Sequence, residues 1–210
     1  MKTAKIITVS FCISLVLGMI SCNNGEGLMN LLSQKAENLD INKDFQTIEV
    51  QGEYSLKVPS YMKADTALHP DASLAYQHAV KEVATLVLDE YTSEIKESLP
   101  YMDGYSDSSS FIENYTNIQL NLIAEGLLYP EFGEIHLKEI DEYPASQVWM
   151  EGRIDGMDIA YFITCVLANE KIYFVMSYTS KEKKTKFGDT FQKIGDSFTI
   201  LSHVKDEATE

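Results

Sequence analysis

Alternating apolar and polar positions recur from residue 45 onward and predict β-strands. Tyr54–Val58 alternates cleanly and ends at a proline, which cannot donate a ladder hydrogen bond. With Phe45–Gln51 it predicts a hairpin about Gly52. Two further strands are expected over Ser73–Gln77 and Glu82–Glu90, and the second is apolar on nearly both faces, as is typical of a central strand.

The second half of the domain predicts a four-stranded meander. Asp155-Gly156 is a strong hairpin signal, because glycine tolerates the positive φ that such turns require. Residues 168–170 make the next turn. The strands expected around these turns are Glu134–Ile140, Ser146–Ile154, Asp158–Leu167 and Lys171–Tyr178.

A helix is predicted over Asp107–Leu127, between the two groups of strands. Ser110 and Glu113 fit a capping box, in which each side chain satisfies a backbone N–H of the first turn. Apolar residues then recur at helical spacing and form one stripe, made of Phe111, Tyr115, Ile118 and Leu122.

A second amphipathic helix is predicted over Thr179–Phe198, where Thr179 and Glu182 fit another capping box. Its stripe consists of Phe187, Phe191, Ile194 and Phe198. Burial of each phenylalanine would contribute roughly 2–3 kcal/mol. The Lys-rich run at residues 181–186 is interpreted as the solvated start of this helix.

The first 21 residues have the parts of an export signal. Lys2 and Lys5 precede an uncharged apolar stretch, Ile6–Ile20. This stretch is shorter than the ~20 residues that a spanning helix needs. It ends in Met19-Ile20-Ser21-Cys22, which resembles the lipobox of bacterial lipoproteins. The resemblance implies that Cys22 carries a thioether-linked lipid and that Cys22 becomes the new N-terminus.

Four segments are therefore expected along the chain: a lipoprotein signal peptide at 1–21, a lipidated cysteine and flexible tether at 22–44, one folded domain at 45–201 and a disordered tail at 202–210. Lipidation would place the domain in the bacterial cell envelope. We expect the outer membrane, and the sequence does not specify which face. Cys165 is then the only free thiol, and its apolar neighbours predict a small buried side chain.

The chain is strongly acidic, with a formal net charge of −15, and loss of Lys2 and Lys5 makes it about −17. Such a charge repels phosphates, so nucleic acid is not an expected partner. Residues 85–142 carry 13 acidic side chains against Lys96 and Lys138. This half of the domain is either a solvated face or a docking surface for a basic partner.

Common catalytic patterns are absent from the sequence, including Gly-x-Ser-x-Gly, the P-loop, the dinucleotide-binding glycines and His-Glu-x-x-His. We therefore expect no enzyme activity, no catalytic residue and no cofactor. The four histidines have no paired spacing of the kind that a zinc site uses.

Two weaker patterns bear on ligands. Asp103 and Asp107 bracket a short loop and are weak metal candidates, but the calcium-loop spacing fails because Tyr105 stands at the third position. A turn followed by a helix cap is the favoured interpretation, so no metal is expected. Trp149 is either a core residue or, with the tyrosines, part of a sugar-stacking surface, and its apolar neighbours favour the core.

The order of these elements, together with several short segments, resembles the PsbP/Mog1-like superfamily and is similar to small lipoproteins of this kind from Bacteroidetes. The segments are Tyr54–Pro59 with Tyr61 beyond it, Ser73–Gln77, Lys81–Val83 and Leu88–Glu90. The likeness covers about residues 45–201. It implies an α+β fold in which an antiparallel sheet is packed between helices, as an α/β/α sandwich.

The resemblance implies an accessory or binding role, since the superfamily shares no catalytic residues, and it assigns no ligand-binding residue. Two functions follow as hypotheses. The first is a lipid-anchored extracytoplasmic protein that presents its domain to a protein partner in the envelope. The second is a small-ligand binder, for glycan or metal, with a cleft between the sheet and the helix near Ser110–Leu127.

Overall fold

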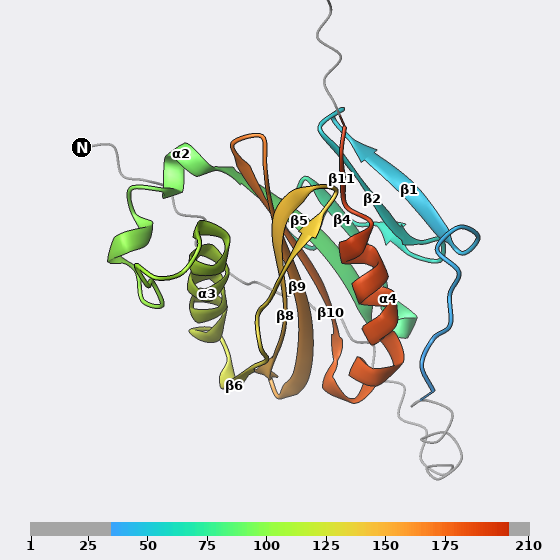
Figure 1. Ribbon diagram of the computed structural model, residues 1–210. Helices are drawn as coiled ribbons and strands as arrows, with labels where there is room; N and C mark the ends of the chain where they lie inside the picture. The colour runs from blue at the N-terminus through green and yellow to red at the C-terminus, as the bar shows by residue number, and fades with distance from the viewer. Residues whose placement is uncertain (1–34, 202–210) are drawn as a thin grey trace, which may run out of the picture.

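The computed structural model describes residues 35–201, and they form a large antiparallel sheet with helices on both faces (Figure 1). The sheet has eight strands in the order β3-β4-β5-β10-β9-β8-β6, and β7 also pairs with β8. Its strands are β3 (Lys63–Ala64), β4 (Leu74–His78), β5 (Val83–Tyr91), β6 (Leu128–Phe132), β7 (His136–Ile140), β8 (Tyr143–Ile154), β9 (Met157–Ala168) and β10 (Lys171–Ser180). The α+β class and the antiparallel sheet between helices are confirmed.

A second, three-stranded sheet lies on one side of the large one, in the order β1-β2-β11. Its strands are β1 (Phe45–Val50), β2 (Tyr54–Pro59) and β11 (Thr199–Ile200). The predicted hairpin about Gly52 is present, with Gly52 at a φ of 72°. The tight hairpins at Asp155-Gly156 and Asn169-Glu170 are also formed, each with positive φ at both turn residues.

Three α-helices are described: α2 (Thr92–Ile95), α3 (Phe111–Ala124) and α4 (Lys184–Asp196). Three short 3-10 turns cover Ala79–Lys81, Leu99–Tyr101 and Lys181–Lys183. In Figure 1, α3 lies against one face of the large sheet and α4 against the other, beside the β1–β2 hairpin. None of the helices in the described part of the chain combines the length and apolar character needed to cross a membrane.

The face under α4 holds a core rich in aromatic residues. Phe187, Phe191 and Ile194 from α4 and Phe198 just beyond it are all at most 1% exposed, as their spacing predicts. Two tyrosines complete this core, Tyr54 from the hairpin and Tyr173 from β10. The ring centroid of Tyr54 lies 5.2 Å from that of Phe198 and 5.2 Å from that of Tyr173. At Gly195 an added Cβ would lie 2.3 Å from Thr164 Oγ1, so glycine allows α4 to approach β9 closely.

The face under α3 holds a more aliphatic core. Ile112, Tyr115, Ile118 and Ile123 of α3 are buried against β8, β9 and β10 residues such as Met150, Ile163 and Met176. The predicted stripe is therefore half correct: Tyr115 and Ile118 are buried, whereas Phe111 and Leu122 are only half-buried. The buried surface of α3 is broad and includes the polar residues Asn114, Thr116 and Gln119.

Both predicted caps differ in detail from the structure. Ser110 does cap α3 by accepting a hydrogen bond from the Glu113 N–H, although the helix starts at Phe111, later than predicted. The Thr179 capping box is wrong. Thr179 and Ser180 continue β10 by pairing with Ala160 and Ile159, and α4 starts at Lys184 without a side-chain cap.

Residues 35–44 contact the domain, whereas the sequence analysis assigned them to a flexible tether. The buried Glu37 carboxylate accepts a hydrogen bond from Tyr61 Oη at 2.8 Å and pairs with Lys81 Nζ at 2.6 Å. The Glu37 N–H donates to the Lys186 carbonyl, and Lys193 donates to the Leu39 carbonyl. The described end of the expected tether is thus held against α4.

Candidate functional site

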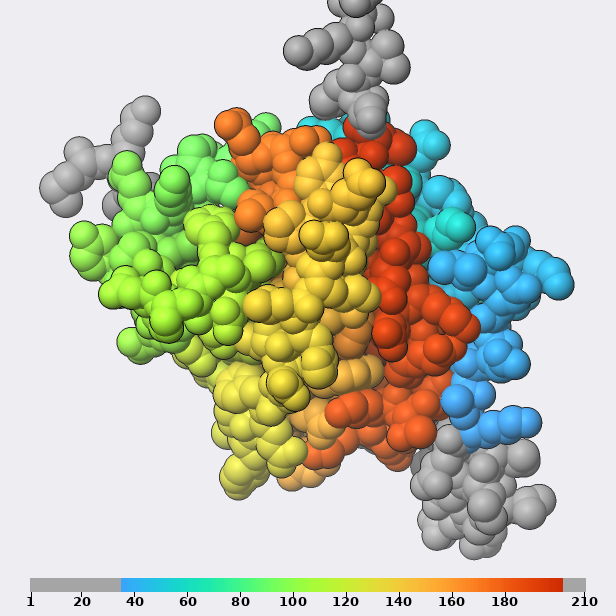
Figure 2. Space-filling model, viewed as in Figure 1, coloured from blue at the N-terminus to red at the C-terminus, as the bar shows by residue number. Residues whose placement is uncertain are grey.

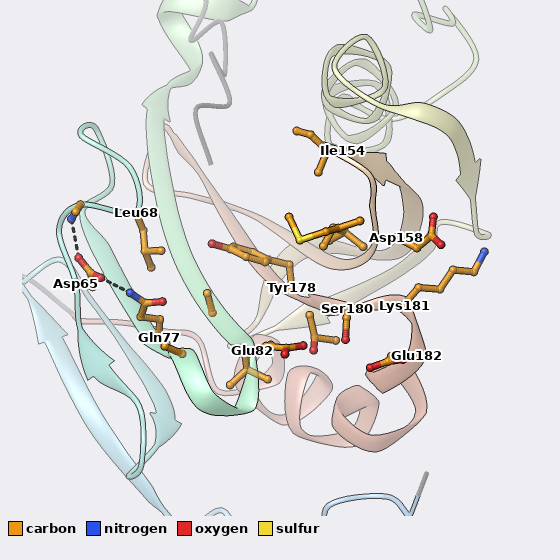
Figure 3. A pocket seen from close by; sticks show the side chains of 17 residues that line it. Asp65, Leu68, Gln77, Glu82, Ile154, Asp158, Tyr178, Ser180, Lys181 and Glu182 are labelled. Atoms are coloured by element: carbon orange, nitrogen blue, oxygen red, sulfur yellow. Dashed lines mark hydrogen bonds between the residues drawn. The ribbon is translucent and has the colours of Figure 1, made fainter. Parts of the chain in front are cut away.

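An open cavity of about 890 Å³ lies on the α3 side of the large sheet, at the end where β10 leads into α4 (Figure 3). Its volume is within the range of small-molecule sites. No lining residue belongs to α3, which covers the opposite end of the same strands. The lining residues are Asp65, Ala67, Leu68, Gln77, Ala79, Glu82, Val83, Ala84, Ile154, Met157, Asp158, Ile159 and Tyr178 to Glu182.

The floor of the cavity is apolar because inward-facing positions of β5, β9 and β10 continue into it from the core. Ala84, Ile159 and Tyr178 are buried members of the α3-side core and also line the cavity. Leu68 and Met157 pack against the same core from the walls. An apolar molecule of moderate size would therefore contact a preformed surface.

The rim of the cavity is mainly acidic, with four carboxylates and Lys181. Two of these carboxylates form ion pairs with basic side chains. Glu82 pairs with Lys183 at 2.7 Å, and Asp158 pairs with Arg153 at 2.8 Å. Asp65 and Glu182 make no ion pair with any residue between 35 and 201.

Lys181, on the rim, is engaged by carboxylates of β6 and β8. It pairs with Glu151 at 2.7 Å and with Glu131 at 3.5 Å. Burial tends to raise the pKa of Glu151, but hydrogen bonds from Lys181 and Lys184 outweigh it and lower the pKa. Three lysines of the Lys-rich run, Lys181, Lys183 and Lys184, are therefore ion-paired, so the run is not a wholly solvated helix start.

Asp65, Gln77 and Tyr178 form a polar group on one side of the cavity. Gln77 Nε2 donates to Asp65 Oδ2, and the Ala67 N–H donates to Asp65 Oδ1. Tyr178 is only 6% exposed, and in Figure 3 its hydroxyl points toward the side where Leu68, Asp65 and Gln77 lie. Burial raises the pKa of Tyr178 to about 12, and the negative charge of Asp65 adds to this effect.

A second surface feature is an exposed apolar patch at the edge of the large sheet. It consists of Leu128, Tyr129, Phe132 and Leu137, and we call it the β6–β7 patch. These four are among the seven large hydrophobic residues that are exposed in the described chain, and their exposed fractions run from 47% to 78%. In Figure 2 the yellow β6–β7 segment lies open at the surface between α3 and α4.

The metal candidates Asp103 and Asp107 are both exposed in the loop before α3. Asn121 Nδ2 donates to the Asp103 carbonyl, and the buried Asn114 binds both Ser106 and Ser109. Within residues 35–201, no group of three or more histidine, cysteine or acidic side chains is arranged to hold a metal ion. The loop hydrogen bonds agree with the interpretation as a turn followed by a helix cap.

Trp149 and Cys165 both contribute to packing. Trp149 is half-buried against Phe162, at 4.9 Å between ring centroids, and Lys184 Nζ lies 4.7 Å from its ring. Cys165 is fully buried on the other face, as predicted, and burial raises the pKa of its thiol to about 12. Cys22, the predicted lipidation site, lies outside the described residues, as does the expected tail at 202–210.

Sequence reasoning missed both the cavity and the patch. The cavity residues come from separate segments whose meeting depends on strand order, so no local motif marks them. The patch was missed because β6 does not alternate: Pro130 interrupts it, Tyr129 has a φ of 52° and the register with β8 shifts between Leu128 and Glu131. The one available signal was a cluster of large apolar residues beside a turn.

Comparison with known proteins identifies the fold through solved structures. No protein-family model matches the chain, and no curated protein matches it significantly. The solution structure of cyanobacterial PsbP (CyanoP) from Synechocystis sp. PCC 6803 matches with a TM-score of 0.51 at 8% identity, covering 86% of this chain and 98% of that one.

Two further matches are weaker. LpqN from Mycobacterium tuberculosis, described as involved in cell envelope biogenesis, gives a TM-score of 0.41 at 9% identity and covers 79% of this chain and 83% of its own. A protein from Bacteroides thetaiotaomicron gives a TM-score of 0.46 at 8% identity, and the match covers 76% of this chain and 50% of that chain. The CyanoP match, the antiparallel sheet and the helix on each face together show that this chain has the PsbP/Mog1-like fold.

Proposed function

We propose that this chain is a lipid-anchored accessory protein outside the cytoplasm, and that it presents the β6–β7 patch to a protein partner in the cell envelope. The observation that carries the proposal is the patch itself: four large apolar side chains exposed within ten residues at a sheet edge. Large apolar side chains exposed along one sheet edge are a feature of surfaces that bind other proteins.

The details of the edge favour contact through side chains rather than strand addition. Pro130 removes a backbone donor from β6, and the irregular register with β8 interrupts its ladder. Glu131, Glu134 and Glu139 are interspersed with the patch residues along this segment of the chain. A partner surface with apolar residues and a basic border would be complementary.

The proposed location outside the cytoplasm and the lipid anchor are supported by the signal-like first 21 residues and by the lipobox at Cys22. A fold by itself does not specify function, so the CyanoP match supports only the shape of the domain. Replacing Cys22 by alanine should abolish incorporation of labelled lipid. Labelled lipid that followed the Cys22→Ala protein would contradict the anchor.

Binding of a partner protein at the β6–β7 patch is tested by cross-linking in native membranes, followed by purification of the full-length chain. The patch variant Leu128→Ser/Leu137→Ser should lose a protein that the wild type recovers. The matched control Val80→Ser/Tyr101→Ser changes two other exposed apolar residues and should retain it. Equal recovery with the patch variant, or no cross-linked protein at all, would contradict the proposal.

A second candidate function, the binding of a small ligand, is favoured by the cavity. The sequence hypothesis placed a glycan or metal cleft between the sheet and the Ser110–Leu127 helix. The cavity instead lies beside that helix, over the uncovered ends of β5, β9 and β10. Its apolar floor suits a hydrophobic ligand better than a sugar or a metal ion.

A further inference from the structure

We propose that the cavity binds a small amphiphilic amine, with the ammonium group held by Asp65, Gln77 and Tyr178 and the apolar body lying on the floor. This proposal is independent of the β6–β7 patch, since the two sites share no residue. It specifies a ligand class for the second candidate function.

The polar group offers acceptors that match the donors of a primary ammonium. The Asp65 carboxylate has no cationic partner in the described chain, and only neutral donors, Gln77 Nε2 and the Ala67 N–H, contact it. Because Gln77 uses its amide nitrogen on Asp65, its amide oxygen is left to accept. A primary ammonium has three donors and no acceptor.

Tyr178 supplies the third acceptor and an aromatic surface. Its hydroxyl makes no hydrogen bond with any residue of the described range, and the nearby Gln77 amide nitrogen and Asp65 carboxylate are occupied with each other and with the Ala67 N–H. Its ring is buried in the floor, beside Tyr161 at 6.0 Å between centroids. A primary ammonium at this position would therefore have three acceptors, one each from Asp65, Gln77 and Tyr178.

The rest of the lining selects against the alternatives. A carboxylate or phosphate head would meet Asp65 and Glu182 without a free cation, because Lys181 is engaged by Glu151 and Glu131. A neutral alcohol would bury the same apolar chain but would gain no charge-assisted hydrogen bond. The structure therefore ranks amine over alcohol over carboxylate for one chain length.

Isothermal titration of residues 23–210 with octylammonium, octanol and octanoate tests this ranking. Octylammonium should bind saturably and at least tenfold more tightly than octanoate, with octanol between them. No saturable binding, equal affinities or a preference for octanoate would each overturn the proposal.

Two variants test which side chains bind the ammonium group. Asp65→Asn keeps an acceptor for the Ala67 N–H but removes the charge, and it should weaken octylammonium binding about tenfold while leaving octanol unchanged. Tyr178→Phe should weaken octylammonium binding by a smaller factor. Asp71→Asn is the matched control, since Asp71 is exposed and outside the cavity. Unchanged octylammonium affinity in Asp65→Asn would overturn the assignment.

Discussion

The two faces of the large sheet are covered differently. On one face α4 and the β1–β2 hairpin together bury an aromatic core that includes Phe187, Phe191 and Tyr173. On the other, α3 packs over one end of the strands, and the cavity lies over the other end. One sheet can thus be a closed core on one side and a binding surface on the other, and the difference follows from how much chain is available to cover each face.

The largest effect on stability is expected from truncating a buried aromatic side chain on the closed face, under α4. Phe191→Ala removes a ring that is 1% exposed, and large aromatic truncations of this kind cost about 3–5 kcal/mol. Phe111→Ala on the α3 face should cost clearly less, because Phe111 is only half-buried. Denaturant melts of residues 23–210 measure both. Gln192→Ala, an exposed position on α4, is the control and should lie within about 0.5 kcal/mol.

The two faces also differ in how their buried charged groups are paired. On the α4 face, replacing Lys171 tests the contribution of its ion pairs to stability. Lys171 Nζ lies 2.7 Å from Glu53 of the hairpin turn and 3.2 Å from Asp89 of β5, so it ties the small sheet to the large one. Lys171→Met would leave both carboxylates without their cation and should cost about 1–3 kcal/mol. Chemical denaturation near neutral pH checks this, and a neutral result would mean that the ion pairs do not hold the hairpin.

The α3 face instead buries a carboxylate that has no cation. Burial raises the pKa of Glu90, and the hydrogen bond donated by Tyr115 offsets only part of this. A carboxyl group whose pKa is raised by folding stabilises the protein below its unfolded pKa, and that contribution is lost as the pH rises through the folded pKa.

Glu90→Gln keeps an acceptor for Tyr115 and removes the charge. The variant should therefore be more stable than the wild type at about pH 7 and nearly equal to it at about pH 4, below the ordinary glutamate pKa of about 4.3. Melts across this range decide the sign. A variant less stable than the wild type at about pH 7 would show that the buried charge is compensated.

Local patterns in the sequence predicted most elements, because alternation and helical spacing depend on neighbours in the chain. The buried stripe of α4 and the hairpin turns at Asp155 and Asn169 are of this kind. The pairing of β5 with β10 joins residues about 90 apart, such as Thr85 and Ser177, and no local pattern specifies it.

The candidate sites were less predictable for the same reason. Asp65 and Tyr178 come to one cavity only because β4, β5 and β10 are neighbours in the sheet. The Thr179 capping box shows the opposite error. A local signal was present, but pairing with β9 kept Thr179 in the strand and moved the helix start to Lys184.

The most direct test of the difference between the faces is to enlarge one alanine on each. Ala145 is a 1% exposed member of the aromatic core, and Ala84 is 3% exposed but lines the cavity. We predict that Ala145→Leu costs about 1–3 kcal/mol by overpacking. Ala84→Leu should change the free energy of unfolding by no more than about 0.5 kcal/mol, because its added carbons extend into the cavity. Equal costs at the two positions, measured by denaturant melts, would contradict an open α3 face.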